Sequence, residues 1–281
     1  MSTFKQLLSL GTHQNKKMKI LAVFLLSISL AAQQTPSGPA GNEAQANQQK
    51  ARAILQQAIQ ALGGQAYLNV QDFKEEGRAG SFYHGQSSGR ESLYFRTWLW
   101  PDKERIEYTK QRDIAVVYNG DNAYEITFRG TRLLDPAKED NIRLYLLRRS
   151  HSLETILRQW LQDAGTALFY EGSSLVENHQ VDTVTLMNAK NDAVTLQVDS
   201  ATHLPVKKSF TIRDPQSRER DEISEVYDNW KQVQGVMAPY NLTLLKNGEL
   251  TYQRFISAIS FNTHPSENIF APLVNFDRNK K

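Results

Sequence analysis

The residue types that perform catalysis are sparse in this chain and widely scattered. Its 281 residues include no cysteine and only six histidines, so thiolate catalysis, disulfide bonds and cysteine-ligated metals are excluded. Any chemistry would have to use carboxylates, hydroxyls, lysines or single histidines. No H-E-x-x-H sequence and no spaced carboxylate motif occurs. The sequence therefore predicts no catalytic residue, no metal site and no cofactor, and a hydrolase is its weakest interpretation.

One stretch, "VDSATHLPVKK", places Asp199 close to His203. Asp199 ends one alternating apolar run and Pro205 begins another, a pattern that predicts two strands joined by a turn. In such turns aspartate and threonine side chains accept hydrogen bonds from backbone N–H groups. We therefore predict a structural corner of a sheet rather than a catalytic pair.

A second pair, His151 and Glu154, has the spacing H-x-x-E near the start of a predicted helix. The pair could share a metal ion, but it lacks the second histidine of the zinc protease motif. We predict that it lies on a solvated surface.

The same region carries four arginines that give it a basic character. They are Arg143, Arg148, Arg149 and Arg158. Such a face could meet anionic lipid headgroups or a membrane surface. The favoured alternative is a solvated face on which they pair with Glu139, Asp140 and Glu154.

The elements that position these residues follow an amino terminus typical of export. Lysines precede an apolar run from Ile20 to Ala32 that is too short to span a bilayer. We predict a signal peptide over residues 1–32, cleaved near Ala31 or Ala32, with Met18 as an alternative start. Four of the 33 basic residues and none of the 30 acidic residues lie in it, so the rest carries a net charge of about −1. Nucleic-acid binding driven by net charge is therefore excluded.

The rest of the chain predicts one domain over residues 50–275, between a flexible linker at 33–49 and a polar tail at 276–281. The linker is rich in Gln, Pro, Gly, Ala and Asn. A helix follows it, because apolar residues recur every three or four positions from Ala51 to Leu62 and Gly63-Gly64 can end it.

Runs of β-branched and aromatic residues then alternate with short turns, which predicts an antiparallel meander. The runs cover residues 90–100, 103–109, 113–128, 181–199 and 238–261. Asn119-Gly120 and Asn247-Gly248 are dipeptides that favour primed hairpin turns. Two helices between Asp135 and Gly165, the second capped by Ser152, interrupt the meander. The predicted fold is α+β: a curved antiparallel sheet, or open half-barrel, with an amino-terminal helix and an inserted helical hairpin as a lid.

Both faces of the strand "SLYFRTWLW" carry large apolar groups, so we expect the sheet to be covered there on both sides. Tyr94, Trp98 and Trp100 either line a pocket or belong to the core, and the core is favoured. The candidate ligand-binding residues combine this strand with the apolar stripe of the second inserted helix. They are Leu93, Phe95, Leu99, Trp98, Trp100, Ile156, Leu157 and Trp160.

The order of features resembles the periplasmic carriers of the outer-membrane lipoprotein-sorting (LolA-like) superfamily. The resemblance covers roughly residues 51–273 and rests on a D-x-x-T-x-L-P hairpin, a "GVMAP" strand entry and a closing "NIFAP". The hairpin begins at Asp199, the strand entry at Gly235 and the closing segment at Asn268. The resemblance implies an open half-barrel closed by helices, located in the periplasm.

What the resemblance implies for function is binding without catalysis. It predicts a non-enzymatic carrier, monomeric, that holds a lipid or lipoprotein acyl chain in an apolar cavity and meets a membrane or envelope proteins transiently. The alternative is a protein-interaction or sensory module of the cell envelope on the same fold.

Overall fold

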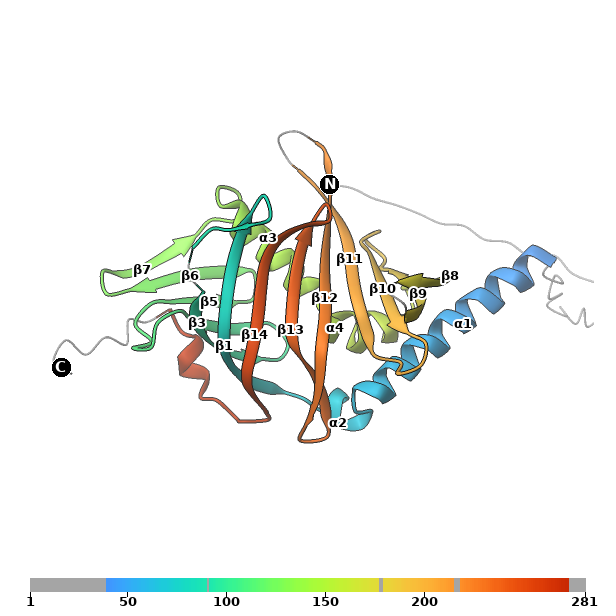
Figure 1. Cartoon of the computed structure of the whole chain (residues 1–281), viewed down its shortest axis with the longest axis horizontal. Helices are drawn as coiled ribbons and strands as arrows, with labels where there is room; N and C mark the ends of the chain where they lie inside the picture. Colours follow the sequence, from blue (N-terminus) through green and yellow to red (C-terminus); the bar gives the residue numbers. More distant parts are fainter. Residues whose placement is uncertain (1–38, 90, 177–178, 215–217, 273–281) are drawn as a thin grey trace, which may run out of the picture. The chain divides into compact units, whose positions relative to one another are not determined.

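The computed structural model describes residues 39–89, 91–176, 179–214 and 218–272. The predicted signal peptide, the alternative start and the polar tail lie outside these residues. Within them the strands form a 14-stranded antiparallel sheet accompanied by a few helices (Figure 1). No helix of the described ranges is long and apolar enough to cross a membrane.

The amino-terminal helix α1 spans Pro39–Leu62 and is followed by the short helix α2, Gln65–Leu68. It therefore begins inside the segment 33–49, for which a flexible linker is predicted. Alanine, glutamine and glutamate favour helix even without an apolar stripe. The helix is also held in place: the side-chain amide of Asn47 donates to the carbonyl of Tyr170 and accepts from its N–H, both at 2.8 Å. The apolar stripe is buried as predicted.

The first strands follow one another from the centre of the sheet to one edge. The later strands begin at the opposite edge and return to the centre. The outgoing strands are β1 (Asp72–Tyr83), β2 (Gln86–Ser87), β3 (Ser92–Leu99), β4 (Lys103–Glu107), β5 (Ala115–Asn119), β6 (Asn122–Thr127) and β7 (Gly130–Leu134). The returning strands are β8 (Ala167–Val176), β9 (His179–Met187), β10 (Ala193–Asp199), β11 (Pro205–Arg213), β12 (Arg220–Val233), β13 (Val236–Lys246) and β14 (Glu249–Phe261). The order across the sheet is β7-β6-β5-β4-β3-β1-β14-β13-β12-β11-β10-β9-β8, with β2 paired only to β1. The sheet is open, with β7 and β8 at its edges.

Two helices connect these edges: α3 (Asp140–Ser150) and α4 (Leu153–Arg158), here called the helical pair. A 3-10 turn, η1 (Trp160–Gln162), follows it. Ser152 caps α4 as predicted, since its hydroxyl accepts from the N–H of Thr155 at 3.2 Å. The predicted α+β fold, with its open antiparallel sheet, amino-terminal helix and inserted helical hairpin, is confirmed.

Three clusters of buried apolar residues hold the helices and 3-10 turns against the sheet. The largest joins the stripe of α1 and the buried face of α4 to strands β8 to β14 and to Phe73 of β1 and Trp98 of β3. A second lies beneath Ile142 of α3 and includes Tyr94, Ile106 and Tyr118. A third gathers around Phe270, in the 3-10 turn η2 (Glu267–Phe270), and takes in Leu99. The helical pair therefore covers the face on which the first two clusters lie.

The two hairpin dipeptides behave differently. Asn247 and Gly248 are the central residues of a two-residue turn and both have positive φ, as predicted. In the other hairpin Asn119 pairs with Asn122, so the central residues are Gly120-Asp121, one position later than predicted. The positive φ falls on Gly120, the residue that tolerates it without steric cost.

Candidate functional site

A cavity of about 150 Å³ lies between the sheet and the helical pair. One end is apolar. It is lined by residues that include Leu62, Tyr67, Val70, Phe73, Trp98, Trp230, Val236, Met237 and Phe261. The other end is charged. It is lined by Glu75, Arg96, Arg148, Arg149, Glu225 and Arg254. The cavity is therefore amphipathic along its length.

Strand alternation explains this division into two ends. Strands β3, β12 and β14 run in the same direction, because β3 and β14 both pair antiparallel with β1, and β12 and β14 both pair antiparallel with β13. Along each strand a charged inward residue is followed two positions later by an apolar or aromatic one. These steps are Arg96 to Trp98, Glu225 to Tyr227 and Arg254 to Ile256. A charged row thus lies beside an apolar row across several strands.

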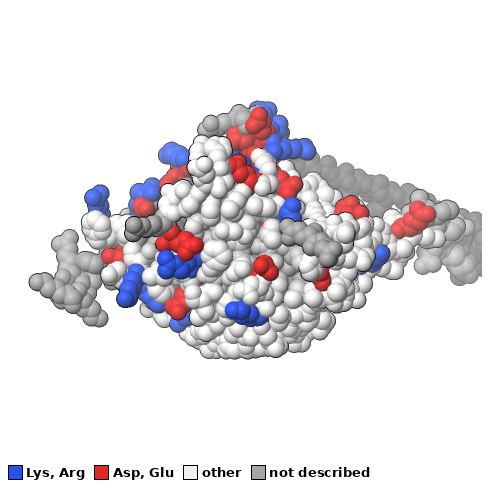
Figure 2. Space-filling model, viewed as in Figure 1, with Lys and Arg blue, Asp and Glu red and all other residues white. Residues whose placement is uncertain are grey.

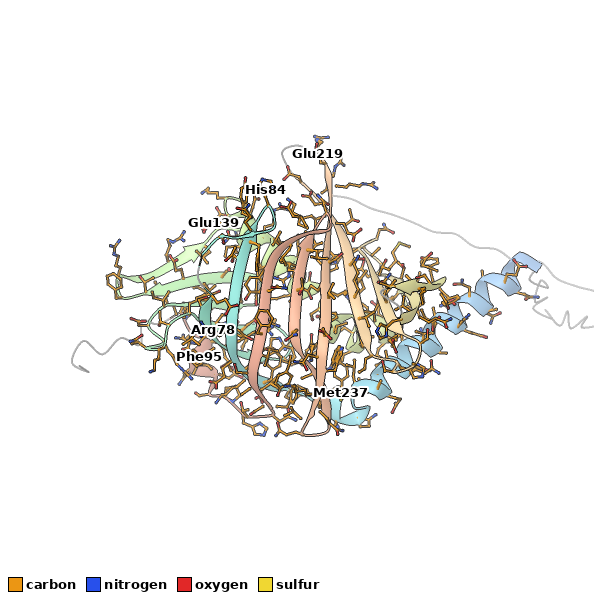
Figure 3. The ribbon with its side chains drawn as sticks, viewed as in Figure 1. Arg78, His84, Phe95, Glu139, Glu219 and Met237 are labelled. Atoms are coloured by element: carbon orange, nitrogen blue, oxygen red, sulfur yellow. The ribbon has the colours of Figure 1, made fainter. Side chains whose placement is uncertain are left out.

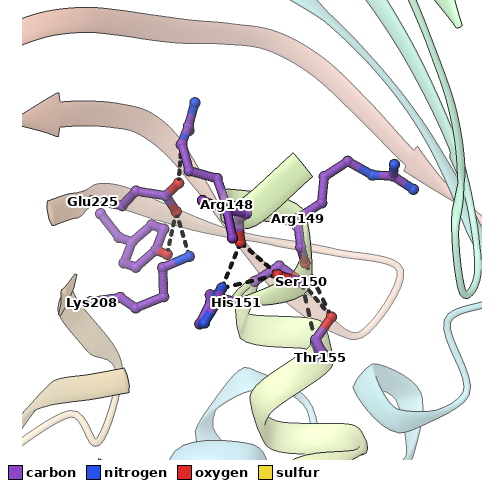
Figure 4. Close-up of polar contacts among 10 residues, drawn as sticks. Arg148, Arg149, Ser150, His151, Thr155, Lys208 and Glu225 are labelled. Carbon is purple, nitrogen blue, oxygen red and sulfur yellow. Dashed lines mark hydrogen bonds and ion pairs between the residues drawn. The ribbon is translucent and has the colours of Figure 1, made fainter. Parts of the chain in front are cut away.

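One buried ion group, the Glu225 group, consists of Lys208, Glu225 and Arg148 (Figure 4). Glu225 lies 2.9 Å from Lys208 Nζ and 2.7 Å from Arg148 Nε, and it also accepts from the hydroxyl of Tyr227 at 2.8 Å. Burial alone would raise the pKa of Glu225, but the two cations outweigh it and hold the pKa well below its usual range.

A second buried ion group, the Glu75–Glu104 group, links α3 to strands β1, β3, β4 and β14. Glu75 lies 3.1 Å from Arg254 and 3.5 Å from Arg96. Arg96 also contacts Glu104, which lies 3.4 Å from Arg149. Burial would raise the pKa of Glu104, but Arg96 and Arg149 lower it below the ordinary value.

The arginines of the helical pair thus depart from the predicted solvated face. Arg143 does pair with Asp140, at 3.3 Å. Arg148 and Arg149 instead turn inward to the sheet, where strand carboxylates compensate them. Arg158 donates to the carbonyl of Val70 at 2.8 Å. The prediction of a solvated face is wrong for Arg148 and Arg149, because the fold pairs them with strand acids that are distant in the sequence. Arg158 is partly buried and bonds a backbone carbonyl instead of a helix acid.

The predicted ligand-binding residues separate into three places. Trp98 lines the cavity. Trp100 packs against the ring of Trp98, with 5.7 Å between the ring centroids. Leu93, Phe95 and Leu99 alternate with Trp98 and point to the opposite face of the sheet. There Phe95, labelled in Figure 3, has the guanidinium of Arg112 over its ring.

The remaining three predicted residues belong to the helical side. Ile156 and Leu157 are fully buried in the largest apolar cluster, and Trp160 packs at its margin. The cavity touches α4 instead through Leu153, Glu154 and Thr155. The predicted ligand-binding residues include none of the charged end of the cavity. For two of its arginines, Arg148 and Arg149, the sequence left contact with anionic headgroups as the less favoured alternative. Arg96 lies two positions before Trp98 and therefore on the same face of β3, which could have placed it in the cavity as well.

His151 is buried, so the predicted solvated surface is wrong for it. Only 6% of the residue is exposed. Its Nδ1 lies 2.6 Å from the carbonyl of Leu147, and its ring stacks on Phe210 at 4.7 Å between centroids. Burial lowers its pKa. Its helix neighbour Glu154 lines the cavity instead.

Asp199 occupies the corner that the sequence predicts. Its Oδ1 accepts from the N–H groups of Ala201 and Thr202, at 3.0 and 2.7 Å, and from the Thr202 hydroxyl at 2.9 Å. Burial would raise the pKa of Asp199, but these hydrogen bonds lower it. The histidine beside its carboxylate is His179, at 3.3 Å, rather than His203.

One further motif is present in the chain. Residues 85–89, "GQSSG", have the spacing G-x-S-x-G of a hydrolase nucleophile elbow. That motif requires a sharp turn from a strand into a helix. Here Ser87 lies in β2 of a two-stranded hairpin, and its hydroxyl donates to the carbonyl of Gly89 at 2.6 Å. The motif therefore lacks the structural context of a nucleophile.

Comparisons with known proteins place the fold. No family model matches the sequence, and no curated protein matches it. A solved structure from Vibrio parahaemolyticus, described as an outer membrane lipoprotein-sorting protein domain, is 13% identical with a TM-score of 0.53 and covers 80% of this chain and 97% of its own. The chain has the fold of this domain. A DUF1329 family protein from Desulfovibrio piger shares it, at 11% identity and a TM-score of 0.54, over 79% of this chain and 97% of its own.

The predicted resemblance is thereby confirmed for the fold. At sequence identities this low, the structural similarity establishes a common architecture and not a common function. What the site binds has to be argued from its own residues. In this chain those residues are an apolar row and a charged row that meet beneath the helical pair.

Proposed function

We propose that the protein is an exported, non-enzymatic carrier that binds the acyl chain of a lipid or lipoprotein between the sheet and the helical pair. The observation that carries the proposal is the apolar end of the cavity, whose lining includes the aromatic residues Phe73, Trp98 and Trp230. Each methylene buried there contributes about 0.8 kcal/mol. A chain of a dozen methylenes therefore needs no charged anchor for useful affinity.

The size of the cavity adds a requirement. Pockets for ligands of this size usually measure about 300–1,000 Å³, whereas this one measures about 150 Å³. An acyl chain can enter only if the helical pair moves away from the sheet. The carrier would therefore alternate between a closed form, in which the helical pair lies against the sheet as in this structure, and an opened form that holds the ligand.

The surroundings of the apolar end suit an apolar ligand. Met237 lies near α2, at the lower end of the sheet in Figure 3. On the face shown in Figure 2, charged side chains gather around the end of the β11–β12 hairpin and over β1 to β7, and few lie near α2. On this face the surface around α2 therefore carries little charge.

The wider assignment follows from the same proposal. The Vibrio parahaemolyticus domain is described by outer membrane lipoprotein sorting. We place this protein in the periplasm, as a monomer that contacts a membrane or envelope proteins transiently when it takes up or releases its ligand.

A second function is favoured by the small cavity volume. If the helical pair stays closed, the interior of the fold is nearly filled, as in a protein-interaction or sensory module of the envelope. Such a module would use its outer surface rather than its cavity.

Native mass spectrometry of the detergent-free protein, purified from an envelope fraction, separates the two functions. A carrier should retain about one acyl lipid or lipopeptide per chain, which organic extraction would identify. A ligand-free mass that persists after incubation with envelope lipids would contradict the carrier function and support the interaction module.

A further inference from the structure

The two ion groups beneath the helical pair have more cations than carboxylates. In the described residues, Lys208 and Arg148 share the single carboxylate of Glu225. The Glu75–Glu104 group contains three cations for its two carboxylates. They are Arg254, Arg96 and Arg149. Each group thus holds one surplus positive charge. Glu154 also lines the cavity, which leaves a surplus of one over the whole charged end.

The arginines of the charged end are more exposed than the carboxylates that they compensate. The side chains of Arg96, Arg148, Arg149 and Arg254 are between 13% and 16% exposed. Those of Glu75, Glu104 and Glu225 are only 3%, 0% and 7% exposed. Glu154 also lines the cavity and is only partly buried. Apart from Glu154, a group that enters this end would therefore meet guanidinium groups before the carboxylates that compensate them.

A surplus of buried positive charge is costly unless an anion compensates it. Guanidinium groups bind carboxylate and phosphate oxygens through two parallel hydrogen bonds, which makes arginine well suited to such anions. The neighbouring row of the cavity is apolar. We propose that the charged end binds the oxyanion headgroup of an anionic amphiphile, a carboxylate or phosphate, whose acyl chain occupies the apolar end.

This inference rests on the proposed carrier function and adds the class of the ligand to it. Arg148 is the cation that tests it most cleanly. It is the only member of the Glu225 group that comes from the helical pair. Its removal also leaves Glu225 compensated by Lys208, so that no buried carboxylate loses its last cation.

The experiment measures binding of three probes with one chain and different heads: tetradecanoate, tetradecyl phosphate and tetradecanol. Dissociation constants are determined by calorimetry on the purified protein. The two anions should bind at least about tenfold more tightly than the alcohol. Whichever anion binds more tightly distinguishes a fatty-acid-like from a phospholipid-like ligand.

In Arg148→Gln the preference, measured as the ratio of the dissociation constant of tetradecanol to that of each anion, should fall by about tenfold. Easier opening of the helical pair would change the binding of all three probes alike and therefore cancels in this ratio. The matched control is Arg78→Gln, an arginine paired with Glu91 on the exposed surface, which should keep the preference. If Arg148→Gln does not fold, Arg254→Gln serves the same purpose, because Arg96 still compensates Glu75.

The outcomes separate the two proposals. Equal binding of all three probes by the unmodified protein would overturn the headgroup site and leave the acyl carrier standing. A preference that survives in a folded Arg148→Gln variant and equally in Arg254→Gln would overturn the site as well. Failure of every probe to bind would overturn both the site and the carrier.

Discussion

Arg148 of α3 and Glu225 of β12 lie 2.7 Å apart, and this ion pair attaches the helical pair to the covered face of the sheet. The partner lies 77 positions away along the chain. Glu225 is also the direct cross-strand neighbour of Lys208. A single carboxylate therefore joins the helical pair, β11 and β12, and its removal should disturb all three.

Glu225→Gln should lower the free energy of unfolding by about 3 kcal/mol, because two buried cations lose their shared carboxylate. Urea unfolding followed by circular dichroism measures this as a lower midpoint. The control is Glu249→Gln, whose exposed pair with His84 should contribute less than about 1 kcal/mol. Equal midpoints for Glu225→Gln and the control would show that the ion group does not stabilise the closed form.

The same carboxylate should make stability depend on acid. Its pKa is lower in the folded chain than in the unfolded chain, so the folded state binds fewer protons between the two values. Its contribution is therefore complete above the unfolded pKa of about 4.3 and is lost as the pH falls toward the folded pKa. The stability difference between the unmodified protein and Glu225→Gln should be constant from neutral pH to about pH 5 and shrink below pH 4. A difference that grows with acid would contradict the assignment.

The sequence predicted the fold better than the site, and particular residues show why. The stripe from Ala51 to Leu62 and the cap at Ser152 depend on local spacing, which a sequence displays directly. The position of Arg96 depends on which face of β3 is covered, and that is decided by a helical pair from elsewhere in the chain. Trp98 shares its face, whereas Leu93 and Phe95 do not, so alternation alone could not choose between the two sets.

Gly77 is required where β1 meets β14 in the centre of the sheet. A Cβ atom added there would stand 2.0 Å from the carbonyl oxygen of Phe255, beside the β-bulge at Glu76 and Gly77. Gly77→Ala should therefore destabilise the protein by at least about 2 kcal/mol, because the strands must separate. Gly89→Ala is the matched control, since nothing lies within 4 Å of its added Cβ. Similar thermal midpoints for the two variants would be inconsistent with this close approach.

Asp199 should act through the turn and not through chemistry. Asp199→Ala removes the acceptor of three hydrogen bonds and should cost about 2 kcal/mol of stability. His203→Ala, in the same turn, should change stability by less than about 0.5 kcal/mol and leave ligand binding unchanged. Chemical unfolding and binding of tetradecanoate measure the two effects. Loss of binding in a folded His203→Ala would instead indicate a functional histidine.

The acyl chain should lie against Trp98 and not against Trp160. Trp98 lines the apolar end and stacks on Phe73 at 5.1 Å between ring centroids, whereas Trp160 packs against His151 outside the cavity lining. A brominated acyl chain quenches indole fluorescence at close contact, so its binding should quench part of the emission of the unmodified protein. Trp98→Phe should lose a large share of that quenching, and Trp160→Phe should retain it. Equal quenching in both variants would mean that the chain binds elsewhere on the protein.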